Sequence, residues 1–330
     1  MPKLSILMPT YNGAEFLAEQ VDSILAQDDA DFELIIIDDG SSDGTDDLSR
    51  QHAQLDRRIK VLPSKGNKGQ NARLAELLGV ASGEYVAVSD QDDIWARDRN
   101  SRLFEAMDGR PTAFGRSELI DRNGQPLGKT LLDALNLSYS NERRLQAIFD
   151  PMFSAHAMIT KREAFNVASL SSALPFDWLI ALDSMFSGGV AYVDDAVVFH
   201  RIHGGNQVNK IKTSIDRLTT SQIRNAICFQ TPDRVKLWLT LDYLGRSSVI
   251  PRERSKAFSE LAAHAYSAWF SYWRPFRHDG GLNKALKENL LQYAGGPSDF
   301  VMFSRRIDAL TDVLISPSIA AEIFRQIKRK

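Results

Sequence analysis

Short apolar runs alternate with amphipathic segments from the N-terminus to about Trp95. This alternation is typical of repeated strand–helix units that build a mostly parallel sheet. The predicted strands are Leu4 to Met8, Phe32 to Ile37, Ile59 to Leu62 and Tyr85 to Val88. The helices predicted between them cover Glu15 to Ala26, Gly44 to His52 and Asn71 to Val80. The second strand is apolar almost throughout, so we expect both of its faces to be buried.

Polar clusters follow the ends of these strands. The first strand leads into PTYNG, the second into DDGSSDGT, the third towards NKGQNAR and the fourth into SDQDD. In open α/β sheets, ligands bind outside the carboxyl ends of the strands. We therefore expect the clusters to share one edge of the sheet and to form a binding site there.

The pattern is looser after Thr112. A hairpin is predicted to turn at Asn123 and Gly124, and AHAMITKREAF is interpreted as a strand that enters a helix. A helix, two strands and a Gly-rich loop are predicted for the segment from PFDW to HGGN, and helices alone beyond Gln207. The change of pattern favours a first domain at 1–209 and a helical C-terminal region at 210–330.

Composition indicates an ordinary globular protein, with 330 residues and a formal net charge of -2. Nothing in this charge favours nucleic-acid binding. Between Arg201 and Lys256 there are 11 basic and four acidic residues, which fits either a solvated helix face or contact with phosphates or an anionic membrane. The single cysteine, Cys228, excludes an internal disulfide and suits a reducing compartment.

Localisation is predicted from the apolar runs. The N-terminus enters a strand pattern without a signal-peptide architecture, and the longest apolar runs are broken by Asp183, Asp194 or Arg274. We therefore predict a cytoplasmic protein that would contact a membrane only from its surface. The pattern predicts no oligomeric state.

Six blocks carry a family resemblance. In order they are SILMPTYNG, IIIDDGSSDGT, NKGQNAR, SDQDDIW, FDW and RIHGGN, over roughly the first 210 residues. In order and approximate spacing they resemble family 2 glycosyltransferases with the GT-A fold, a Rossmann-like, mostly parallel central sheet flanked by helices. SDQDDIW and RIHGGN look most like the branch that contains bacterial rhamnosyltransferases. The resemblance implies an inverting transfer from a dTDP- or UDP-sugar to a glycan or lipid-linked acceptor during synthesis of a bacterial surface polysaccharide.

Three carboxylates lie within four residues of SDQDDIW, a crowding that folded proteins tolerate on an open surface or around a cation. Expulsion of a diphosphate needs a counter-charge, and Mn²⁺ or Mg²⁺ held by Asp90 and Asp92 would supply it. By resemblance Asp92 is the direct ligand, Asp90 contacts ribose or metal, and Asp93 supports the loop. His203 is a further metal or phosphate ligand by resemblance, with a structural histidine as the alternative.

The nucleotide is expected between the first two clusters, with candidate contacts from Thr10, Tyr11, Asn12, Asp38 and Asp39. A carboxylate can accept the imide N–H of uracil or thymine, and by resemblance Asp39 makes that contact. Asp38 could instead cap the following turn.

Phosphate contacts are predicted at a helix start and after a late strand. Gly69, Asn71 and Arg73 begin a helix, and Arg201 precedes His203 in extended chain. Lys65 and Lys68 are expected to be exposed. His200 stands where the family usually has tyrosine.

Asp177 is the candidate general base, because an Asp before Trp occupies that position in the resembling branch. Here Phe176 replaces the more usual histidine, and Asp183, six residues on, faces elsewhere on a helix. The alternative for Asp177 is a helix cap.

A sugar nucleotidyltransferase and a non-catalytic glycan-binding protein are the alternative functions. A sugar nucleotidyltransferase would need a Gly-rich, basic N-terminal loop that PTYNG lacks, and a non-catalytic glycan-binding protein would not need the carboxylates and His203. An aromatic stripe from Tyr266 to Phe276 is interpreted as core packing, with a membrane-surface face as the alternative.

Overall fold

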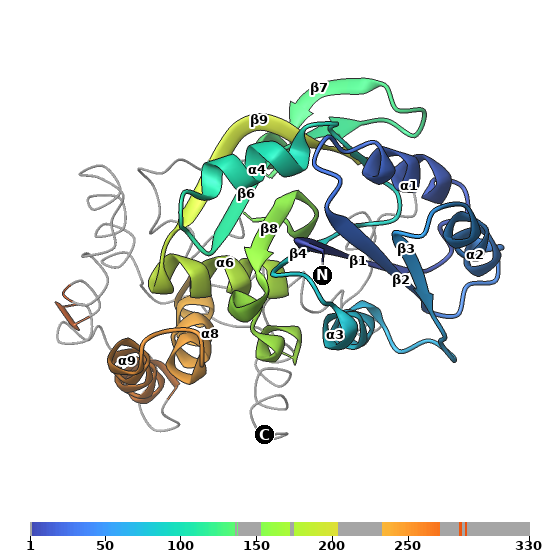
Figure 1. Cartoon of the computed structure of the whole chain (residues 1–330). Coiled ribbons are helices and arrows are strands. Elements are labelled where there is room, and N and C mark those ends of the chain that lie inside the picture. Colours follow the sequence, from blue (N-terminus) through green and yellow to red (C-terminus); the bar gives the residue numbers. More distant parts are fainter. Residues whose placement is uncertain are drawn as a thin grey trace. The chain divides into compact units, whose positions relative to one another are not determined.

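The computed structural model describes residues 2–135, 137, 153–171, 175–203, 233–270, 284–285 and 288 (Figure 1). The chain forms two compact units. The first comprises Met1–Ser138, Phe153–Leu170 and Gly188–His203, and it holds all the strands of the described residues. The second comprises Tyr139–Met152, Ser171–Ser187 and Gly204–Lys330. The boundary predicted at Asn209 lies outside the described residues.

Four parallel strands form one half of the sheet in the order β3-β2-β1-β4. They are β1 (Leu4–Thr10), β2 (Phe32–Asp38), β3 (Ile59–Leu62) and β4 (Tyr85–Val88). Each begins at the residue predicted from the hydrophobic pattern. All seven residues of β2 are buried, which confirms that both of its faces are covered. Because most residues of β2 are apolar, both faces of the strand can pack against helices.

The helices between these strands are α1 (Leu17–Leu25), α2 (Thr45–Leu55) and α3 (Gln70–Val80). Crossovers between parallel strands are right-handed, so the face on which a helix lies depends on the direction in which the chain moves across the sheet. From β1 to β3 the chain moves one way, and from β3 to β4 it returns past β1. Accordingly α1 and α2 lie on one face and α3 on the other (Figure 1). The strand order reverses beside β1, and the carboxyl ends of β1, β2 and β4 therefore lie at the edge where ligands bind in open α/β sheets.

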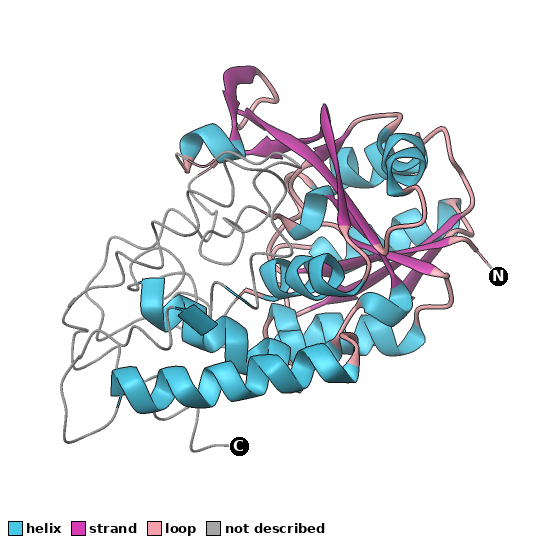
Figure 2. Cartoon of the chain, turned by 90° about the vertical axis from the view of Figure 1, so that its left-hand side faces the viewer, coloured by secondary structure: helices cyan, strands magenta, loops and turns pink. Residues whose placement is uncertain are grey.

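The other half of the sheet is mixed rather than parallel. Its order continues from β4 as β8-β6-β9-β5, with β7 paired to β6. These strands are β5 (Ile94–Trp95), β6 (Thr112–Ile120), β7 (Pro126–Thr130), β8 (Met158–Lys161) and β9 (Val190–Arg201). Helix α4 (Arg99–Met107) packs against β6, β8 and β9. Figure 2 shows the strands crossing the first unit with helices on either side.

Three details of this half were predicted with different success. The hairpin at Asn123 and Gly124 is confirmed by the antiparallel pairing of β6 with β7. The two strands predicted before HGGN are wrong, since β9 is one strand whose register against β6 shifts between Gly115 and Ser117. The strand predicted at AHAMITKREAF is β8, but it leads into a single 3-10 turn, η3 (Arg162–Ala164), instead of a helix.

The long β9 has a direct consequence for the site. Its last residues pair with β5, which places Ile94 opposite Phe199 and Trp95 opposite Val198. The segment that follows the SDQDD carboxylates is therefore joined to the strand that leads into RIHGGN. This pairing brings together two motifs that are more than 100 residues apart.

A buried carboxylate fastens the start of the parallel half. Glu33 of β2 accepts hydrogen bonds from Ser5 Oγ (2.7 Å), Ser82 N (2.8 Å) and Lys60 Nζ (2.6 Å). Burial by itself raises the pKa of the Glu33 carboxyl, but the bonds from Lys60, Ser82 and Ser5 outweigh it and lower the pKa from 4.5 to about 2. The Glu33 charge is thus part of what holds β1, β2 and β3 together.

We expect Glu33→Gln to lower the free energy of unfolding at neutral pH by up to about 3 kcal/mol. A lowered carboxyl pKa contributes stability that is complete above the unfolded value near 4.5 and is lost as pH falls towards 2. The difference between wild type and variant should therefore be constant above pH 5 and shrink by about 1.4 kcal/mol per pH unit below 4.5. Urea denaturation at pH 7, 4.5 and 3.5 measures it. The control Asp46→Asn removes an exposed pair with Arg50 and should change stability by less than about 0.5 kcal/mol at any of these pH values.

The described part of the second unit is helical. It contains α6 (Phe176–Ser187), α8 (Asp233–Arg246) and α9 (Arg252–Phe270). Tyr243 Oη donates to Asp183 Oδ2 (2.5 Å), and Phe186 packs edge-on against Phe258 with ring centroids 5.0 Å apart. Helix α6 is buried along most of its length, as its apolar composition favours.

None of the described helices combines the length and the apolar character that crossing a membrane requires. The side chains of the aromatic stripe from Tyr266 to Phe276, Cys228, and most of the basic segment after Arg201 lie outside what the structure describes. The interpretations placed on them stay predictions.

Candidate active site

The carboxyl ends of β1, β2 and β4 meet as predicted. The side chain of Gln91 bridges to β1, since Tyr11 N donates to Gln91 Oε1 (2.8 Å) and Gln91 Nε2 donates to Tyr11 O (2.9 Å). A Cβ at Gly13 would lie 2.2 Å from Gln91 Cδ, so a larger residue there would displace the Gln91 side chain. Asn12, with a φ of 48°, accepts from Ser42 N (2.9 Å) and donates its own N–H to Ser41 Oγ (2.8 Å).

Asp38 has the capping role that was the alternative for it. Its carboxylate accepts from Gly40 N (2.9 Å), Ser41 N (2.8 Å) and Thr10 Oγ1 (3.1 Å). Both Thr10 and Asp38 are buried. These two residues therefore shape the turn after β2, and direct contact of either with a nucleotide stays a prediction.

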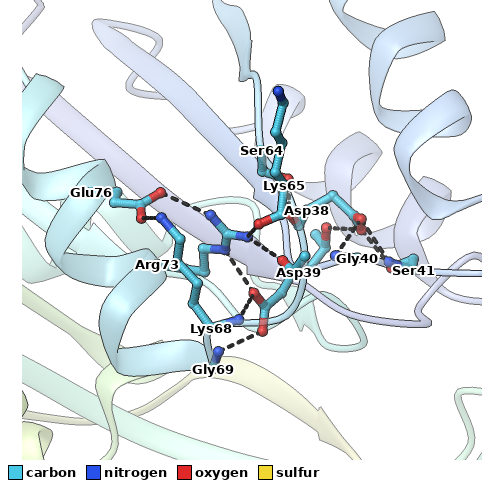
Figure 3. A network of polar contacts seen from close by, with 12 residues as sticks. Asp38, Asp39, Gly40, Ser41, Ser64, Lys65, Lys68, Gly69, Arg73 and Glu76 are labelled. Atoms are coloured by element: carbon cyan, nitrogen blue, oxygen red, sulfur yellow. Dashed lines mark hydrogen bonds and ion pairs between the residues drawn. The ribbon is translucent and has the colours of Figure 1, made fainter.

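Asp39 organises the third polar cluster (Figure 3). Its carboxylate accepts from Lys68 N (2.7 Å), Gly69 N (2.8 Å) and Arg73 Nε (2.7 Å). Arg73 is almost completely buried and also pairs with Glu76 Oε2 at 2.9 Å. The guanidinium predicted to meet phosphate thus binds protein groups, and it holds the carboxylate that is the candidate for base recognition.

The neighbouring residues of this cluster are placed as follows. Lys65 and Lys68 are exposed, as predicted. Asn71 Nδ2 donates to the carbonyl of Leu170 (2.6 Å), so the side chain ties the start of α3 to the later part of the unit. Gly69 precedes α3 with a φ of 85°, a backbone conformation that glycine adopts without strain.

The three carboxylates of the SDQDD loop differ in solvent exposure. Asp90 is about one third exposed, Asp92 is 17% exposed, and Asp93 is completely buried. Asp92 Oδ2 lies 2.8 Å from His203 Nε2. Burial, together with repulsion from Asp93 and Asp90, raises the pKa of the Asp92 carboxyl. The repulsion between carboxylates that the sequence predicted is therefore present. It acts on Asp92, the carboxylate that contacts His203.

The residue types of this set suit a divalent cation, although among the described residues only Asp93, His156 and His200 have ligand atoms that all lie within 4.8 Å of one another. Asp90 and Asp92 offer the carboxylate oxygens that Mg²⁺ and Mn²⁺ prefer, and the imidazole of His203 adds a nitrogen that suits Mn²⁺ better than Mg²⁺. A cation there would relieve the repulsion that raises the pKa of Asp92. His203 itself packs against the ring of Phe16, with centroids 4.9 Å apart, which limits its orientation.

Asp93 supports the loop, as predicted, through partners that the sequence did not reveal. Its Oδ1 accepts from His200 Nδ1 (2.8 Å) and from the backbone N–H of Arg201 (3.1 Å). Burial alone raises the pKa of Asp93, but His200 and His156 outweigh it and leave this pKa below its usual value. Burial lowers the pKa of His200, and the Asp93 charge more than reverses this and raises it to about 9.

Arg201 is buried behind the loop. Its Nε donates to the carbonyl of Asp92 (3.0 Å), Nη1 to the carbonyl of Arg122 (2.9 Å) and Nη2 to Glu19 Oε2 (2.5 Å). Arg201 and His203 thus have different partners, because His203 reaches the Asp92 carboxylate whereas Arg201 fixes the loop backbone. Contact of Arg201 with a diphosphate stays a prediction.

Asp177 lies in the first turn of α6, in the second unit. Its Oδ1 accepts from Trp178 N (2.9 Å), a local contact of the kind expected of a helix-start residue. Its carboxylate is half-buried, whereas Asp183 is fully buried. The role of Asp177 as general base stays a prediction.

Three residues of this site were missed by sequence reasoning: Gln91, Glu19 and His156. Gln91 stands inside the SDQDD motif, so its position could have drawn attention. Glu19 and His156 carry no signal in the chain, because each lies in a helical segment whose partner is distant in sequence.

The order and direction of the strands indicate the fold class of the first unit. Residues 1–349 of TarS from S. aureus, in complex with UDP-GlcNAc, are similar to this structure with a TM-score of 0.55 and 17% identity, covering 94% of this chain and 84% of that one. This likeness shows the fold, which is GT-A. The predicted fold class is confirmed.

The sequence comparison supports the resemblance seen in the motifs. Residues 5–167, just under half of the chain, match the model of Glycosyl transferase family 2. A putative teichuronic acid biosynthesis glycosyltransferase, TuaG, of Bacillus subtilis is 34% identical over 142 residues, which are 42% of this chain and 56% of the relative.

A second relative is the Escherichia coli protein WfgD, described as a UDP-Glc:alpha-D-GlcNAc-diphosphoundecaprenol beta-1,3-glucosyltransferase. It is 34% identical over 122 residues, which are 36% of this chain and 47% of that one. The chain thus spans about half the length of these two curated relatives.

Proposed function

We propose that this protein is an inverting, cation-dependent glycosyltransferase that moves a sugar from a nucleotide-diphosphate donor to a hydroxyl of a glycan or lipid-linked acceptor. The observation that carries the proposal is the SDQDD loop at the carboxyl edge of the sheet, where Asp92 lies 2.8 Å from His203 behind a partly exposed Asp90. The family match over residues 5–167 supports it. The names of the two relatives support a role in the synthesis of bacterial surface polysaccharide.

The donor is proposed to bind between the loops after β1 and β2. Asp39 is held by two backbone N–H groups and by Arg73, so its position is set before a base arrives. An oxygen of this carboxylate can accept the imide N–H of uracil or thymine. Uridine donors gain support from the UDP-GlcNAc complex of TarS and from the name of WfgD, while a dTDP-sugar such as dTDP-rhamnose rests on the branch resemblance alone.

The diphosphate is proposed to meet a Mn²⁺ or Mg²⁺ ion held by Asp90, Asp92 and His203. The ion would neutralise the charge that develops on the leaving diphosphate. The chain's own contribution is a rigid loop: Arg201 fixes the backbone of Asp92, and Gln91 ties the loop to β1. These bonds fix the loop in place, and a preformed site of this kind lowers the cost of orienting a bound donor.

Asp177 is proposed to remove the proton from the acceptor hydroxyl. An inverting transfer needs such a base on the face of the sugar opposite the leaving group. The half-buried carboxylate of Asp177 and its place in FDW support this role. The acceptor itself is proposed from the relatives, of which one name includes a diphosphoundecaprenol-linked sugar.

A screen of nucleotide sugars for thermal stabilisation tests the function. A correct donor at 100 times its dissociation constant should stabilise the protein by about 2.7 kcal/mol, or several degrees in Tm, when Mn²⁺ is present. In EDTA the same donor should stabilise it much less. UDP- and dTDP-sugars are compared with ADP-ribose as a control diphosphate. Equal shifts with and without Mn²⁺ for every donor, or no shift at all, would contradict the proposal.

A further inference from the structure

Two stacked imidazoles lie behind the carboxylate loop. His156 comes from η2 (Ala155–Ala157) and His200 from β9, and their rings stack with centroids 4.8 Å apart and an interplanar angle of 16°. The His156 ring is used at both ends: Nε2 lies 2.9 Å from Ser117 Oγ, and Nδ1 lies 3.2 Å from Asp90 Oδ2. The stack therefore connects the carboxylate loop to the interior of the sheet.

A metal ion shared by Asp93, His156 and His200 is the first explanation to test, since each offers a ligand atom within 4.8 Å of the others. The geometry of the rings argues against it. The nitrogen lone pair of an imidazole lies in the plane of the ring, and two nearly parallel, stacked rings cannot both aim lone pairs at one ion. The cluster is better explained as a chain of hydrogen bonds.

The direction of the hydrogen bond at His156 follows from its partners. A carboxylate only accepts, so the proton between His156 and Asp90 is on Nδ1. Asp90 has no other side-chain hydrogen bond among the described residues. The orientation of this one-third exposed carboxylate therefore depends on His156.

His156 is itself held firmly from behind. The guanidinium of Arg99 is fully buried and donates through Nη2 to the carbonyls of His156 and Met158, both at 2.9 Å. The same guanidinium stacks on Trp95, 3.6 Å from the ring centroid. Burial lowers the pKa of Arg99 to about 9, and no carboxylate of the described residues pairs with it. The two hydrogen bonds from Arg99 fix the backbone of η2. They therefore restrict the positions that Nδ1 of His156 can adopt.

We propose that His156 is a positioning residue that holds Asp90, through Nδ1–H, in the orientation that receives the cation and the nucleotide diphosphate before either is bound. This inference rests on the proposed function, because it concerns the same carboxylates. It adds a residue outside the six motif blocks, placed by η2 on the far side of β4 from β1. Residues that orient metal ligands in this way typically contribute about 10- to 100-fold to metal affinity.

Two substitutions of similar shape test the roles of the two ring nitrogens of His156 separately. In His156→Asn the amide nitrogen can take the place of Nδ1 and donate to Asp90, whereas in His156→Gln it can take the place of Nε2 and reach only Ser117. Mn²⁺ binding by the full-length protein is measured by electron paramagnetic resonance, with Mn²⁺ alone, with UDP and with dTDP. Thermal melting in EDTA verifies that both variants fold.

We expect the dissociation constant for Mn²⁺ to rise about 10- to 100-fold in His156→Gln and to stay within about threefold of wild type in His156→Asn. Unchanged affinity in both variants would overturn the positioning role. Equal weakening in both would also overturn it, because packing rather than the Nδ1 proton would then matter. A wild type that binds no Mn²⁺ under any of the three conditions would instead refute the cation-dependent function as well, so the two failures are distinguishable.

Discussion

Replacing Asp92 with alanine is expected to remove cation-dependent transfer, with a loss on the order of 10²- to 10³-fold or more, the scale seen when one electrostatic contact to a transition state is deleted. Asp92 is the carboxylate that lies nearest to His203 and is the most crowded by charge. Its removal leaves Asp90 and His203 too few to hold an ion against water. Release of nucleotide diphosphate from the donor found in the thermal screen measures the loss, and UDP affinity in Mn²⁺ compared with EDTA shows whether the ion is responsible.

A measurement of thermal stability shows whether Asp92→Ala loses activity because the variant unfolds. Burial and the neighbouring carboxylates raise the pKa of Asp92, which means that its charge is unfavourable in the folded protein at neutral pH. Asp92→Ala should therefore melt no lower than wild type in EDTA. Asp22→Ala, which removes an exposed carboxylate of α1, is the matched control and should leave transfer unchanged. Equal UDP binding by wild type and Asp92→Ala in Mn²⁺ would exclude Asp92 as a ligand.

Replacing Asp177 with asparagine is expected to preserve donor binding and to slow transfer by roughly 10²- to 10⁴-fold, the usual cost of losing a general base. Asparagine keeps an oxygen that can accept from Trp178 N, so the local contact at the start of α6 survives. What is lost is the ability to take a proton. Single-turnover transfer to an acceptor at saturating donor measures the effect, and calorimetry with UDP and Mn²⁺ measures donor binding.

The control for Asp177 is Asp183→Asn. Asp183 accepts from Tyr243 Oη in the buried part of the second unit, so this variant should lose stability rather than the chemical step. If Asp177→Asn transfers sugar at a near-normal rate, Asp177 is a capping residue and the base lies elsewhere. If it also fails to bind donor, the substitution has acted through structure.

The parallel half of the fold was predictable because its signals are local. Each strand from β1 to β4 is a short apolar run between amphipathic helices, and the handedness of the crossovers then assigns every carboxyl end to one edge. The mixed half was not predictable in the same way. β9 is half-polar along its middle and pairs with β6 in parallel and with β5 in antiparallel, so its pattern suggested two strands where there is one.

In the candidate site, too, local features were predictable and contacts between distant residues were not. Asp38, Asp39, Asp90 and Asp92 were recognisable from charge next to buried strands, but the partners that set their properties were not. His200 acts on Asp93 across 107 positions, and His156 on Asp90 across 66. Arg73 and Arg201 look in sequence like phosphate ligands, yet both are buried and bound to protein groups.

By itself, the sequence determined the strand–helix order of the first unit, the edge at which its polar clusters gather and the crowding of three carboxylates on one loop, since each depends on residues close together in the chain. Only the tertiary structure decided which carboxylate is buried, which histidine contacts it and which arginine is engaged. Those properties depend on strand pairing that joins β5 to β9 and β4 to β8, and pairing between distant strands is settled by the packing of the whole sheet.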